Sequence, residues 1–107
     1  MFAGWLRHRI VIQKLVGTKN SYGEVVQSWQ DVATVWASIE PLRGREYVEA
    51  AAAQANVDHR IRIRYRSGIS PKMRVKYGER IFEVVSVIDP REQHKELELM
   101  CKEDVND

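Results

Sequence analysis

Four arginines occupy every second position of one short segment: Arg60, Arg62, Arg64 and Arg66. Positions two apart in an extended strand project from the same face, so these guanidinium groups are predicted to form one basic row. Such a row can follow the phosphates of a nucleic acid, or it can meet carboxylates of the same or a neighbouring subunit. Arg74 and Lys76 extend this basic face if the next hairpin pairs them on the same side.

Acidic residues balance this row elsewhere in the chain. The 107 residues hold 17 lysines and arginines against 15 acids, for a formal net charge of +2. Residues 57–80 carry a local net charge of +6, residues 81–107 carry −5 and residues 1–56 carry +1. Glu96 and Glu98 share one face of the last predicted strand and form an acidic face. The split favours ion pairs between these faces, either within one copy or between neighbouring copies in a ring.

Residues with catalytic or metal-binding chemistry are few. His8, His59 and His94 lie on three different segments, without carboxylates or cysteines at metal-ligand spacing. His59 falls on the apolar face of its strand, which is typical of a hydrogen-bonded core histidine. Cys101 alternates with leucines and is predicted to be a buried, unreactive thiol. No phosphate loop or nucleophile motif occurs, so we expect no enzyme, no metal and no cofactor.

The size of the chain limits how these residues can be arranged. A mass of 12.5 kDa with 44% hydrophobic residues predicts one folded domain over residues 1–107, with a flexible tail at 104–107. No apolar stretch reaches membrane-spanning length, and no secretion leader is recognisable. A lone cysteine suits assembly in a reducing cytoplasm.

Period-2 alternation, broken by glycine and proline, predicts an antiparallel β protein. The expected strands cover residues 6–15, 25–39, 57–66, 74–76, 80–88 and 95–102. Gln30-Asp31 is expected to interrupt the second of them as a turn or bulge, because one strand of that length is unusual. Tyr65 and Tyr77 are predicted to point with the core, away from the basic row, which argues against a platform for stacking bases. Six short strands suggest a small barrel or a sandwich.

One segment has helical rather than strand character. Residues 44–54 are rich in strong helix formers and poor in large apolar side chains. Such a helix is marginal by itself in water. The segment is therefore either a short surface helix that covers one end of the sheet or a segment that becomes ordered against another subunit.

The chain resembles the phage head-tail joining proteins, the stopper or head-completion proteins of long-tailed phages and prophages. The match lies in the order and spacing of short pieces over almost the whole chain. These pieces are LRHRIVIQ (6–13), NSYG (20–23), WQDVATVWASIEPL (29–42), GRE (44–46), HRIRIRYR (59–66), GI (68–69), MRV (73–75), YG (77–78) and FEV (82–84).

The resemblance implies an antiparallel β-barrel of about six strands, with one helix or loop excursion between the second and third main strands. It implies a non-enzymatic ring beneath the portal and adaptor proteins, which retains packaged double-stranded DNA and receives a tail protein. Its location would be the virion, after assembly in the host cytoplasm, without contact to a membrane. The excursion, about 42–56, would reach the channel through Leu42, Arg43, Gly44, Arg45, Glu46, Tyr47, Glu49 and Gln54.

A second hypothesis stays open at this point. The arginine row would make the chain a small barrel that binds nucleic acid directly, with a steep dependence of affinity on salt.

Overall fold

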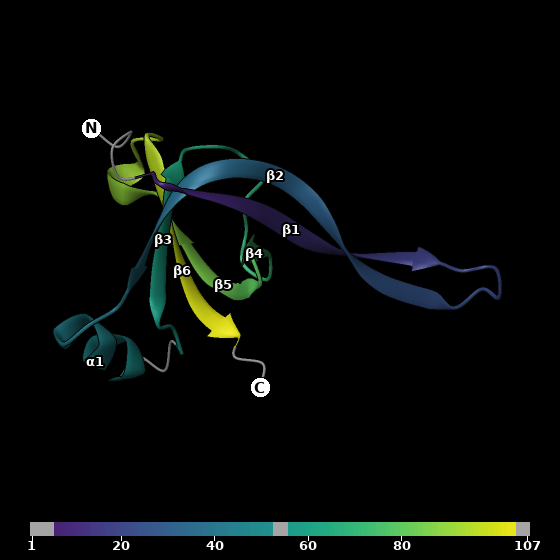
Figure 1. Ribbon diagram of the computed structural model, residues 1–107, viewed down its shortest axis with the longest axis horizontal. Coiled ribbons are helices and arrows are strands. Elements are labelled where there is room, and N and C mark those ends of the chain that lie inside the picture. Colours follow the sequence, from purple (N-terminus) through teal and green to yellow (C-terminus); the bar gives the residue numbers. More distant parts are fainter. Residues whose placement is uncertain (1–5, 53–55, 105–107) are drawn as a thin grey trace.

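The computed structural model describes residues 6–52 and 56–104. The elements are β1 (His8–Lys19), β2 (Val25–Pro41), α1 (Arg45–Ala52), β3 (His59–Arg64), β4 (Arg74–Tyr77), β5 (Arg80–Ile88), the 3₁₀ helix η2 (Pro90–Glu92) and β6 (Glu96–Asp104). The strands close into a barrel in the order β1-β2-β3-β6-β5-β4, with β4 pairing back onto β1 (Figure 1). Every pairing is antiparallel. The predicted mainly-β barrel with a short helix between β2 and β3 is confirmed.

The core fills the barrel with the apolar side chains that the alternation placed on one face of each strand. Ile61 and Ile63 of β3 face Leu97 and Leu99 of β6, and all four side chains are buried. Phe82 of β5 is fully buried in the same cluster. Closure removes the open sheet edges that six short strands would otherwise expose.

β1 and β2 are longer than the sequence predicted, and together they leave the barrel. β2 runs as one strand through Gln30-Asp31, so the turn that was one of the two predicted alternatives is absent, whereas the other, a bulge, is present beside Asp31. The irregularity is a bulge one residue further on, where Ile12 pairs with Ala33 and Gln13 with Asp31, which leaves Val32 unpaired. Beyond this bulge, residues 14–30 continue as a two-stranded ribbon, which we call the arm.

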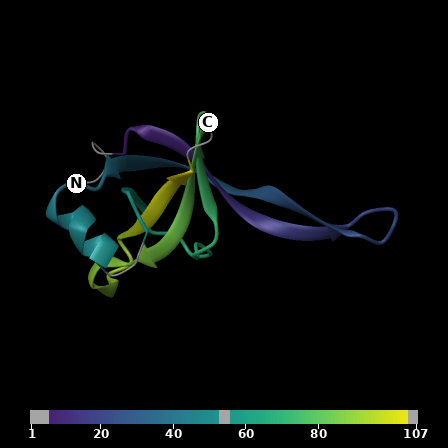
Figure 2. The ribbon, with the colours of Figure 1, turned by 90° about the horizontal axis from the view of Figure 1, so that it is seen from below.

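The arm and α1 project from opposite sides of the barrel (Figures 1 and 2). The molecule is accordingly elongated, with extents of 50 × 30 × 27 Å. Of the predicted C-terminal tail, Asp104 is the last residue of β6, and residues 105–107 lie outside the described residues.

Candidate functional site

The first half of the arginine row lies between carboxylates of the same chain. Arg60 and Arg62 project from the outer face of β3, with Glu98 of β6 on one side and Glu40 of β2 on the other. Glu98 lies 3.4 Å from Arg60 Nε and 3.8 Å from Arg62 Nε. Glu40 lies 4.0 Å from Arg60 Nη1 and 3.9 Å from Arg62 Nη1. This ladder compensates the two charges within one copy.

The predicted basic and acidic faces are therefore one mixed surface. Glu98 sits directly opposite Arg62, and Glu96 is half-buried opposite Arg64 in the same β3–β6 register. The sequence left open whether such pairs form within a copy or between copies. The distances show that Glu98 pairs within the copy.

The second half of the row has a different environment. Arg64 is the last residue of β3 and Arg66 lies beyond it, and both are exposed. They line a pocket of about 260 Å³ together with Leu6, Val35, Trp36 and Tyr65. Neither arginine has an ion pair within residues 6–52 and 56–104. We call this site the aromatic–arginine pocket.

Tyr65 departs from its predicted position in the core. The strand ends one residue earlier, and the tyrosine ring is 39% exposed beside the ring of His94, with centroids 4.5 Å apart. Tyr77 does pack against the core, and its hydroxyl lies 2.9 Å from His8 Nδ1. An aromatic group therefore lies beside the free end of the basic row, which the alternation alone had excluded.

Arg74 and Lys76 do not extend the basic row. β4 pairs with β1 and β5, whereas β3 pairs with β2 and β6, so the two basic strands lie across the barrel from each other. Arg74 Nε donates a hydrogen bond of 2.7 Å to Gln13, and its guanidinium lies 4.2 Å from the Trp29 ring centroid. Lys76 is exposed on the outer face of β4. The predicted extension of the basic row required β4 to present Arg74 and Lys76 beside β3, and the strand order rules this out.

The excursion between β2 and β3 is held at its base and exposed at its helix. The Leu42 N–H donates a 2.8 Å hydrogen bond to the Asp58 carbonyl, and Leu42 and Val57 are both buried. Gly44, directly before the helix, adopts the left-handed region at φ +56°, and Arg43 before it is exposed. In α1, Tyr47 and Val48 are 51% and 64% exposed.

Within the described part of the chain, one ion pair joins the helix to the barrel wall. Glu46 forms an ion pair with Arg60, and Arg45 lies 4.0 Å from Glu49 within the helix. Gln54, predicted as part of this segment, lies outside the described residues. The two ends of the excursion are therefore fixed to the barrel, whereas the helix between them is largely exposed.

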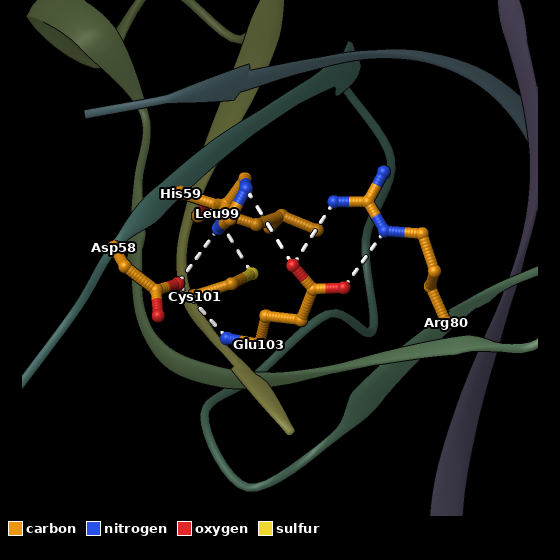
Figure 3. Close-up of polar contacts among 6 residues, drawn as sticks. All are labelled: Asp58, His59, Arg80, Leu99, Cys101 and Glu103. Atoms are coloured by element: carbon orange, nitrogen blue, oxygen red, sulfur yellow. Dashed lines mark hydrogen bonds and ion pairs between the residues drawn. The ribbon is translucent and has the colours of Figure 1, made fainter. Parts of the chain in front are cut away.

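A polar cluster fixes the point where the excursion re-enters the sheet (Figure 3). Asp58 Oδ1 lies 2.7 Å from His59 Nδ1 and accepts the Glu103 N–H at 2.9 Å. The Glu103 carboxylate accepts two hydrogen bonds from Arg80, of 2.7 and 3.0 Å. These bonds lower the pKa of Glu103 and raise that of Arg80. His59, with its side chain 14% exposed, is the hydrogen-bonded core histidine that was predicted.

Cys101 is buried beneath this cluster, as predicted. Burial, reinforced by the nearby Asp58 charge, raises the pKa of its thiol to about 12. The thiol therefore stays protonated near neutral pH, and thiols are poor nucleophiles in that form.

No group of three or more histidines, cysteines and acids suited to a metal ion occurs within residues 6–52 and 56–104. In the same residues, no helix has the length and apolar character needed to cross a membrane.

Sequence reasoning missed the arm and the aromatic–arginine pocket. The sequence signal for the arm is the loss of strict alternation over residues 13–31, where Leu15-Val16 and Val25-Val26 are adjacent apolar pairs. The pocket joins Trp36 of β2 to Tyr65 after β3, and only the strand pairing reveals that proximity.

These features define a small β-barrel with three distinctive exposed parts: the arm, the aromatic–arginine pocket and the helix. A family model described as the phage head completion protein matches residues 1–104. The chain therefore belongs to the phage head completion protein family, and it is a structural virion protein, not an enzyme.

Individual relatives agree with this assignment. Head completion protein gp7 of Enterobacteria phage HK97 is 28% identical over 107 residues, which cover 95% of this chain and 96% of gp7. The solution structure of protein SF1141 from Shigella flexneri 2a matches with a TM-score of 0.77 and 31% identity over the full length of both chains. A chain in the virion of a native gene transfer agent particle shares the fold, with a TM-score of 0.62 at 20% identity over 94% and 97% of the two chains.

Proposed function

We propose that this protein forms a ring at the junction of head and tail, where it retains packaged DNA and provides a docking surface for the tail. The family assignment supports a structural role in the virion. The single observation that carries the proposal further is the excursion, because its helix projects from a closed barrel with Tyr47 and Val48 exposed, and exposed apolar side chains of this kind mark contact sites.

Residues 42–56 are proposed to close the channel of that ring. The hydrogen bond between Leu42 and Asp58 brings the ends of the segment together, so the segment can change position without disturbing the barrel. Such a movement must break the ion pair between Glu46 and Arg60, which joins the described part of the segment to the barrel. A partly exposed ion pair of this kind contributes about 1 kcal/mol or less, which makes movement inexpensive in free energy.

The proposed partners are further copies of the chain, the portal or adaptor proteins on the head side, a tail protein on the other side, and double-stranded DNA in the channel. The proposed location is the head-tail interface of the virion, reached by assembly in the host cytoplasm.

Direct nucleic-acid binding by the arginine row is the weaker hypothesis. Arg60 and Arg62 already lie between Glu40 and Glu98, so phosphate binding there would have to displace carboxylates. Those acids repel phosphates as well.

Particles assembled without this chain test the proposal. We expect full-size heads that package DNA, lose it on storage and carry no tails, whereas supplying the wild-type chain restores both DNA and tails. Tailed, DNA-stable particles made without the chain would overturn the proposed function. Nuclease digestion of the released DNA measures retention, and electron microscopy counts the tails.

A further inference from the structure

The arm exposes large apolar side chains on a ribbon that lies outside the barrel core. Leu15, Tyr22, Val25, Val26 and Trp29 account for five of the exposed large hydrophobic residues. An isolated two-stranded ribbon is at best marginally stable in water, and exposed apolar patches of this kind mark contact sites. The arm therefore needs a partner.

The tip of the arm has a defined shape. Asn20 Oδ1 accepts the N–H groups of Tyr22, at 2.9 Å, and Glu24, at 3.0 Å, and Gly23 adopts a φ of +81°. This turn leaves Tyr22 86% exposed and Val25 65% exposed. Glu24 has no ion pair within the described part of the chain. The tip presents an aromatic ring, an aliphatic side chain and a carboxylate.

The aromatic–arginine pocket has the complementary chemistry. Trp36 is 50% exposed, and Tyr65 supplies a second aromatic side chain. Arg64 and Arg66 add two uncompensated positive charges to the lining. A volume of about 260 Å³ admits one aromatic side chain, and aromatic residues seated in pockets dominate the energy of many interfaces.

We propose that the arm tip of one copy docks in the aromatic–arginine pocket of a second copy, with Tyr22 in the pocket and Glu24 beside Arg64 and Arg66. The pocket is lined by residues at the end of β3 and just beyond it, and the arm extends away from β3 (Figure 1). Contacts between unlike surfaces repeat from copy to copy and can close a ring. Duplex DNA could use the arginines but not the aromatic side chains, because its bases are stacked inside the helix.

This inference rests on the proposed function, so its test is made in assembled particles that carry the full chain. The variant Ser21→Cys with Ser67→Cys places one thiol at the tip and one beside Arg66 at the edge of the pocket, and it keeps both arginines. The matched control combines Ser21→Cys with Lys76→Cys, an exposed base on the far side of the barrel. Cys101 is buried and stays silent towards a short bismaleimide linker.

The test pair should produce a ladder of cross-linked multimers under denaturing electrophoresis, and the control should not. Adding Tyr22→Ser should weaken the ladder at least about tenfold, because this tyrosine has no role in the fold of one copy. Particles that contain the chain but give no ladder overturn this inference alone. Linked dimers from Ser21→Cys by itself, or links to another virion protein, also overturn it. Particles that lack the chain overturn the proposed function and this inference together.

Discussion

Replacing residues 43–56 with a four-residue turn should leave the barrel folded while removing the proposed gate. The flanking residues Leu42 and Val57 stay buried, and the hydrogen bond from Leu42 to Asp58 already closes the base like a hairpin. Shortening the connection from 14 to 4 residues favours the folded state by roughly 1 kcal/mol. Losing the Glu46–Arg60 pair costs about 1 kcal/mol or less.

The two contributions nearly cancel, so urea unfolding should give a free energy within about 1 kcal/mol of the wild type. Leu42→Ala is the matched control, because removing a buried leucine side chain costs about 2–5 kcal/mol. Particles that carry the shortened chain should lose DNA faster than wild-type particles. A loss above about 3 kcal/mol would show that the excursion belongs to the core, and unchanged DNA retention would refute the gating argument.

Three further predictions concern the polar contacts. Because the pKa of Glu103 is lowered in the folded state, this carboxylate stabilises the fold at pH values above its ordinary pKa of about 4.3. The stabilisation is lost as the pH falls through the lowered pKa. Glu103→Gln should therefore remove this part of the acid sensitivity in unfolding curves recorded from pH 7 to 2. Cys101, with its pKa raised to about 12, should resist iodoacetamide at pH 8 until urea unfolds the chain, and rapid labelling of the folded protein would contradict its burial. Arg60→Ala should destabilise the barrel by about 1–2 kcal/mol, because Glu40 and Glu98 each lose one of their two arginine partners and the pair with Glu46 is lost. Arg64→Ala should change stability by less than about 0.5 kcal/mol, and equal losses would contradict the ladder.

Local pattern was enough to predict most strands of the barrel. Residues 57–66 alternate strictly because one face packs in a core, and β3 falls within that range. The same logic predicted the buried leucines of β6 and the helical character of α1. A strand with one face in a core alternates apolar and polar residues, so its position can be predicted from the local sequence.

Features that depend on long-range pairing could not be predicted in the same way. Alternation does not show which strand lies beside β3. The sequence therefore allowed the prediction that Arg74 extends the basic row, whereas β4 lies across the barrel from β3. Tyr65 continues the apolar face in sequence, but the strand ends before it and the ring becomes exposed. The arm could not be predicted because β1 and β2 continue to pair with each other after their contact with the rest of the barrel has ended, and a local pattern does not show where that contact ends.

A reconstruction of the head-tail junction by cryo-electron microscopy would test the central proposal most directly. We predict a ring of this chain beneath the portal, with residues 42–56 facing the channel and the two ends of the excursion still joined between Leu42 and Asp58. A map that places the chain elsewhere in the particle, or that turns the excursion away from the channel, would contradict the proposed function.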